Sequence, residues 1–152
     1  MSKNIVLTVG NSMMGDDGAG TLLAEMMQEN PVADWVVIDG GSAPENYVHQ
    51  IRELSPARVL IIDAAEIGEK AGEIRIIEPD QIAEMFIMST HCLPLNFLIE
   101  ELETFVPEVT FVGIQPAIVA FSFPMTDMVR DAVTTVYQSL PTWQGNGGFA
   151  VV

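Results

Sequence analysis

Residues 4–20 read NIVLTVGNSMMGDDGAG, and this stretch decides the fold. An apolar run of strand length, residues 4–9, leads directly into a loop with glycines at positions 10, 15, 18 and 20. Apolar side chains then recur at helical spacing through residues 18–30, which predicts a helix. A strand that enters a glycine-rich loop before a helix usually suggests a phosphate site.

The same alternation of apolar runs and amphipathic stretches continues along the chain. Further strands are predicted at residues 35–38, 58–63, 73–77 and 109–114, and further helices at 44–54, 79–86, 95–103 and 126–140. The run RVLIID at 58–63 is typical of a strand that is covered on both faces. The sequence therefore predicts a three-layer α/β fold, with a largely parallel sheet between helices. Residues 1–152 are expected to form one domain, with a flexible, glycine-rich tail over about 141–152.

The charge balance excludes some classes of partner. Six basic residues against 21 acidic ones give a net charge of −15, which argues against nucleic acid and against an anionic membrane surface. The apolar run near the N-terminus is too short for a signal peptide or a membrane span. The only cysteine, Cys92, excludes an internal disulfide and fits a reducing compartment. We therefore expect a cytoplasmic protein.

The glycine-rich loop has the spacing of a phosphate-binding loop and the opposite charge. Gly10 and Gly15 match G-x-x-x-x-G, but Asp16 and Asp17 stand where Lys and Ser or Thr are required. Two carboxylates about 5 Å apart repel by roughly 3 kcal/mol at an effective dielectric near 20, and a divalent cation would reverse that sign. A dinucleotide site is an alternative, because Asp39 ends the second strand, but the glycines do not form G-x-G-x-x-G. The sequence favours a cation over a nucleotide.

The two acids have a structural and a functional interpretation. One of them is expected to cap the first helix through free backbone N–H groups, and Asp16, nearer the turn, is the better candidate. Asp17 is then the candidate ligand, although both acids could serve as caps without any site. Asp63 ends the third predicted strand. Because the first and third strands of such sheets commonly lie side by side, Asp17 and Asp63 are expected at one crevice.

A histidine in a polar turn completes the candidate set. His91 precedes a predicted helix, whereas His49 lies within one and is expected at the surface. Two carboxylates and an imidazole would supply three metal ligands with open positions, as in catalytic sites. Cys92 beside His91 also raises a cysteine-nucleophile hypothesis, but nothing marks the thiol as activated.

Several segments together resemble the [NiFe]-hydrogenase maturation endopeptidases. They are VGNSMMGDDGAG (9–20), VVIDGGSAPEN (36–46), the strand end IDA (62–64), GEIRII (72–77), THCLPLNFLI (90–99) and FVGIQP (111–116). The likeness covers nearly the whole chain, and the ordered set is more specific than any one segment. It implies a twisted five-stranded sheet sandwiched between helices.

The resemblance also implies an activity and a site. Such enzymes remove a short C-terminal extension from the hydrogenase large-subunit precursor after nickel insertion. The second acid of the family motif G-N-x-x-x-x-D-[DE] falls on Asp17, the acid after the third strand on Asp63, and the histidine on His91. All three are expected to be catalytic and to contact nickel, which the precursor supplies. A non-catalytic docking module or metallochaperone for the nickel centre remains the alternative.

Overall fold

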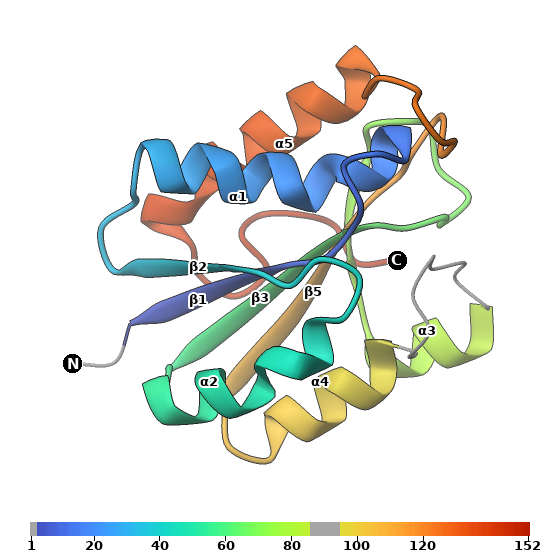
Figure 1. Ribbon diagram of the computed structural model, residues 1–152. Helices are drawn as coiled ribbons and strands as arrows, with labels where there is room; N and C mark the ends of the chain where they lie inside the picture. Colours follow the sequence, from blue (N-terminus) through green and yellow to red (C-terminus); the bar gives the residue numbers. More distant parts are fainter. Residues whose placement is uncertain (1–2, 86–94) are drawn as a thin grey trace.

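The computed structural model of the protein describes residues 3–85 and 95–152, in which strands and helices alternate (Figure 1). The strands are β1 (Asn4–Thr8), β2 (Trp35–Asp39), β3 (Arg58–Ala64), β4 (Ile74–Ile77) and β5 (Glu108–Ile114). The helices are α1 (Ala19–Glu29), α2 (Val48–Leu54), α3 (Pro79–Met85), α4 (Leu95–Glu103) and α5 (Asp127–Ser139). Three short 3-10 turns accompany them: η1 (Gly15–Gly18), η2 (Pro44–Tyr47) and η3 (Leu140–Thr142). Each strand and helix predicted from the sequence is present.

The five strands form one sheet in the order β2-β1-β3-β5-β4. The pairs β1–β2, β1–β3 and β3–β5 are parallel, and only β4 runs antiparallel to its neighbour β5. The predicted α/β fold with a largely parallel sheet is therefore confirmed, as is the adjacency of the first and third strands. β2 lies on one side of β1 and β3 on the other, so the direction in which strands are added to the sheet reverses between β1 and β3. Ligands of such sheets bind at that point, beyond the carboxyl ends of the strands.

Strand alternation divides the core into two layers, one on each face of the sheet (Figure 1). Val6, Leu60 and Ile62 face α1 and α5, whereas Leu7 and Ile61 face the layer of α2, α3 and α4. All five side chains are fully buried. Burying an aliphatic side chain of this size contributes about 1.5–3 kcal/mol, so the sheet is a rigid base for any residue at its edge.

The C-terminal tail contacts the edge of the sheet at β4. Trp143 is buried, and its ring centroid lies 5.9 Å from that of Phe149. The Ile76 N–H of β4 donates to the Ala150 carbonyl at 2.8 Å, and the Val152 N–H donates to the Ile76 carbonyl at 3.0 Å. The flexibility expected of the tail from its glycines stays a prediction, although these contacts give the tail defined partners at the edge of β4.

None of the helices within residues 3–85 and 95–152 has the length and apolar character that a membrane-spanning helix requires.

Candidate active site

The loop after β1 folds back so that its own backbone surrounds Asp17. The Asn11 N–H donates to the Asp17 carboxylate at 2.9 Å and to its carbonyl at 3.2 Å. Gly10, at φ +141°, makes this approach possible, because a Cβ there would lie 2.0 Å from the Asp17 carbonyl oxygen. The loop is thus shaped to hold a carboxylate beside the end of β1.

Most backbone N–H groups of this loop donate hydrogen bonds to other atoms of the protein. The N–H groups of the following residues donate to other protein atoms: Gly10, Asn11, Met13, Met14, Asp16 and Asp17. A phosphate-binding loop turns such groups toward its ligand instead. This hydrogen bonding, together with the buried acids, supports the rejection of a nucleotide site.

Asp17 and Asp63 both lie at the carboxyl edge of the sheet: Asp17 in η1, in the loop after β1, and Asp63 near the end of the neighbouring strand β3. Thr8, the last residue of β1, is in register with Ile62 of β3, and the Val9 N–H donates to the Ile62 carbonyl at 2.9 Å. The exposed fractions of Asp17 and Asp63 are 3% and 1%. Burying a carboxylate is costly, so two buried acids at the point where strand order reverses make this edge the candidate functional site. The predicted placement of both acids at this edge agrees with the structure.

Asp16 has a different role from the helix cap that its position suggests. It is completely buried, and its carboxylate accepts hydrogen bonds from the N–H groups of Ala117 (2.8 Å), Ile118 (3.0 Å) and Thr126 (2.7 Å). The Thr126 hydroxyl also donates to it, at 2.9 Å. The first residue before α1 is Gly18, which provides no side-chain cap. The cap prediction for Asp16 is therefore wrong: its partners lie in the loop between β5 and α5.

Of the other candidate site residues, two lie at the surface and two lie outside the residues that the structure describes. His49 is exposed and lies 3.1 Å from Glu53, as expected of a surface residue. Asp39, the candidate for a ribose contact, is exposed and accepts a hydrogen bond from the Gly41 N–H of its own turn at 3.2 Å. His91 and Cys92 lie outside the described residues. Among the residues that are described, no group of three or more His, Cys, Asp or Glu side chains could hold a metal ion.

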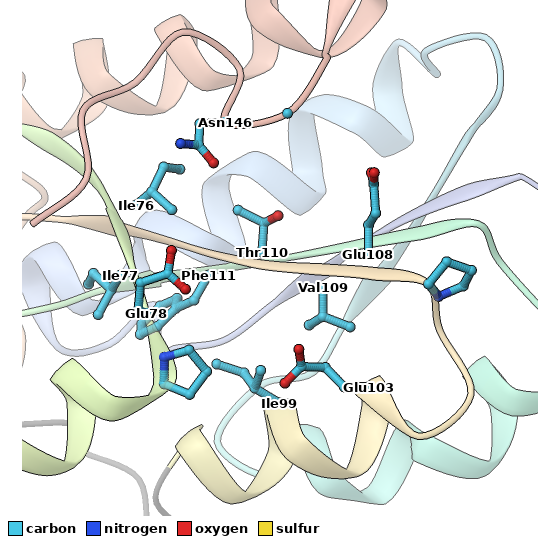
Figure 2. A pocket seen from close by; sticks show the side chains of 13 residues that line it. Ile76, Ile77, Glu78, Ile99, Glu103, Glu108, Val109, Thr110, Phe111 and Asn146 are labelled. Carbon is cyan, nitrogen blue, oxygen red and sulfur yellow. The ribbon is translucent and has the colours of Figure 1, made fainter.

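A hollow of about 280 Å³ lies elsewhere, beside the first half of β5 and past the end of β4 at Ile77. Glu103 and Ile99 project toward it from α4, and Asn146 lies on the opposite side of β5 (Figure 2). Thr110 lines it near the start of β5, whereas Gly113, which pairs with Asp63, stands near the end of that strand. The hollow is therefore separate from the edge that carries the two buried acids.

One feature of this edge was not predicted from the sequence. The loop of residues 117–125, AIVAFSFPM, contains no charged residue and exposes Phe121 and Phe123 beside the loop that carries Asp17. The sequence does carry a signal for this exposed apolar loop: nine consecutive residues without charge in a chain that has 27 charged residues.

Comparison with known proteins gives consistent matches in sequence and in structure. Residues 20–143 match the sequence model of the family described as HycI, hydrogenase maturation protease, a range that includes Asp63 and His91 but not Asp17. The chain is 62% identical over 147 residues to the Hydrogenase 3 maturation protease of Escherichia coli (strain K12), which covers 97% of this chain and 94% of the relative.

Solved structures agree with the sequence matches. A crystal structure of a hydrogenase 3 maturation protease superposes with a TM-score of 0.93 at 61% identity, over 98% of this chain and 96% of that one. The [NiFe] hydrogenase maturation protease HycI of Thermococcus kodakarensis KOD1 superposes with a TM-score of 0.81 at 25% identity, over 92% and 90% of the two chains.

Proposed function

Because the chain belongs to the hydrogenase maturation protease family and is thus an endopeptidase, we propose that it processes the large-subunit precursor of a [NiFe]-hydrogenase. It removes the C-terminal extension of that precursor in the cytoplasm, after nickel has been inserted. The 62% identity to a protease named for hydrogenase 3 favours a client of that type.

Asp17, Asp63 and His91 recognise the nickel that the precursor carries. The observation that carries this assignment is the pair of buried carboxylates, Asp17 and Asp63, at the edge where β1 and β3 lie side by side. A cation presented by the client would offset the cost of holding two acids there. Carboxylate and imidazole are suitable ligands for a divalent transition metal, and the metal would polarise a peptide carbonyl or activate water.

The topology supports a place for His91 near the two acids. The side chain of Asp63 shares a face of β3 with Ile61, which packs in the layer of α2, α3 and α4. His91 stands four positions before Leu95, the first residue of α4. Because α4 leads into the parallel strand β5, its first residue lies toward the carboxyl edge of the sheet. The described residue that follows His91 most closely in the sequence therefore lies toward this edge, which supports the assignment.

The test is incubation of the purified protein with nickel-loaded and nickel-free precursor, followed by mass measurement of the large subunit. We expect truncation of the loaded form alone. Equal rates for both forms would remove nickel from the recognition step. A protein that binds the loaded precursor and yields no truncated product would instead be a docking module or metallochaperone.

A further inference from the structure

Exposed apolar side chains gather beside the candidate active site. Met13, Phe121 and Phe123 are 57%, 65% and 52% exposed, and Ile118 and Val119 are also exposed. We call these five residues the apolar rim. Single exposed apolar residues are common, whereas several of them on two touching loops are typical of an interaction surface.

Hydrogen bonds hold the two loops of the rim together. The Ser122 N–H donates to the Met13 carbonyl at 2.9 Å, and the Asp16 N–H donates to the Ile118 carbonyl at 2.8 Å. The buried Asp16 carboxylate also accepts hydrogen bonds from the loop after β5. Gly15, at φ +61°, allows this contact, since a Cβ there would lie 2.6 Å from the Ile118 oxygen. The exposed aromatic side chains therefore stand on a preformed surface, which lowers the entropic cost of binding.

The rim lies beside the loop that carries Asp17, one of the residues assigned to nickel recognition. Asp16, which anchors the rim, immediately precedes Asp17, and Figure 1 shows the loop after β5 beside the start of α1. A hollow of about 200 Å³ adjoins the rim and is lined by Ser12, Leu22, Phe123 and Met125, among others. Such a hollow can accept an anchoring side chain of a partner. A client whose nickel site reaches Asp17 therefore comes close to this surface.

We propose that the apolar rim is the surface on which the nickel-loaded large-subunit precursor docks through apolar side chains next to its nickel site. This inference rests on the proposed function, because it takes the client of the same site as the occupant. A second copy of the chain fits less well, because each copy carries a net charge of −15 and the two would repel each other. Docking through apolar contacts needs no basic residues, and the rim contains none.

The test replaces the two aromatic residues of the rim, in the variant Phe121→Ser/Phe123→Ser. Leu54→Ser is the matched control, because Leu54 is 44% exposed at the end of α2, just before the amino end of β3. Both variants change exposed side chains and should melt close to the wild-type temperature. Loss of two aromatic anchors should raise the KM for nickel-loaded precursor at least about tenfold with kcat within about twofold, whereas Leu54→Ser should keep both values.

Three other outcomes would overturn the rim as a docking surface. The first is an unchanged KM for the double variant while the wild type cleaves, which leaves the proposed function intact. The second outcome applies if the wild type does not cleave, in which case the proposed function fails. The Kd for the intact loaded precursor is then compared between the wild type and the double variant, and equal Kd values overturn the rim. The third is a wild-type dimer in sedimentation that the double variant converts to a monomer, which makes the rim a self-association surface.

Discussion

The carboxylate of Asp16 accepts hydrogen bonds from Thr126, 110 positions later in the chain, through its backbone N–H at 2.7 Å and its hydroxyl at 2.9 Å. Thr126 is the residue directly before α5, so this contact fixes the start of α5 relative to the loop after β1. The same carboxylate binds the N–H groups of Ala117 and Ile118. One buried side chain therefore joins the loop after β1, which carries Asp17, to the loop after β5, which carries four of the five rim residues.

Replacing Asp16 should destabilise the protein more than replacing any exposed acid. In Asp16→Ala three backbone N–H groups lose their acceptor, which we expect to lower the free energy of unfolding by about 3 kcal/mol. Asp16→Asn keeps one acceptor oxygen and should cost less, about 1–2 kcal/mol. Urea unfolding measures both values.

Asp131→Ala is the control for this experiment, because Asp131 lies on the exposed face of α5. Its free energy of unfolding should change by no more than about 0.5 kcal/mol. An Asp16→Ala protein as stable as this control would show that the buried hydrogen bonds of Asp16 contribute nothing to the fold.

The fold was largely predictable because its signals are local. Apolar runs such as RVLIID and the helical spacing between them lie within short windows, and the rules for parallel sheets then place β1 beside β3. The position of Asp17 and Asp63 at one edge follows from those rules. The antiparallel pairing of β4 depends instead on how the chain returns to the edge of the sheet.

The role of Asp16 could not be predicted in the same way. An acid just before a helix fits the pattern of a cap equally well, and the donors that bind Asp16 are backbone groups of an irregular loop. Backbone N–H groups leave no mark in the sequence. The role of His91 stays a prediction, because it lies outside the described residues.

Asp17→Asn should abolish processing without unfolding the protein. The amide retains an oxygen that can accept the Asn11 N–H, so the loop keeps its main contact. The loss of a negatively charged ligand should lower the rate of precursor cleavage by about 100-fold or more, since even outer-shell partners of metal ligands are worth 10–100-fold. Truncation of the large subunit, followed by mass spectrometry, gives this rate.

The matched control for Asp17 is Asp39→Asn. Asp39 ends the neighbouring strand β2, is exposed, and accepts hydrogen bonds from Thr8 and Gly41. We expect its cleavage rate to stay within about twofold of wild type, because its exposed carboxylate already accepts a hydrogen bond within its own turn. Equal losses for both variants would point to general electrostatics rather than to Asp17 as a ligand.

His91→Ala should also stop cleavage of the nickel-loaded precursor while the protein remains folded. In the proposed site His91 supplies one of three contacts to the client's metal, so we expect a decrease of about 100-fold or more. His49→Ala is the control, because His49 is exposed on α2 beside Glu53. Normal processing by His91→Ala would reject its assignment to the site.

Gly10→Ala should disturb the backbone that holds Asp17. The new Cβ would lie 2.0 Å from the Asp17 carbonyl oxygen, so the loop must move, and we expect a loss of about 3 kcal/mol in the free energy of unfolding. Gly41→Ala is the control: it also has a positive φ, +57°, but its Cβ meets nothing within 4 Å, so only backbone strain of about 1 kcal/mol is expected. Urea unfolding compares the two, and cleavage assays on the folded fraction should show a decrease for Gly10→Ala alone. Equal effects of both variants would mean that the close contact between Gly10 and Asp17 does not position the acid.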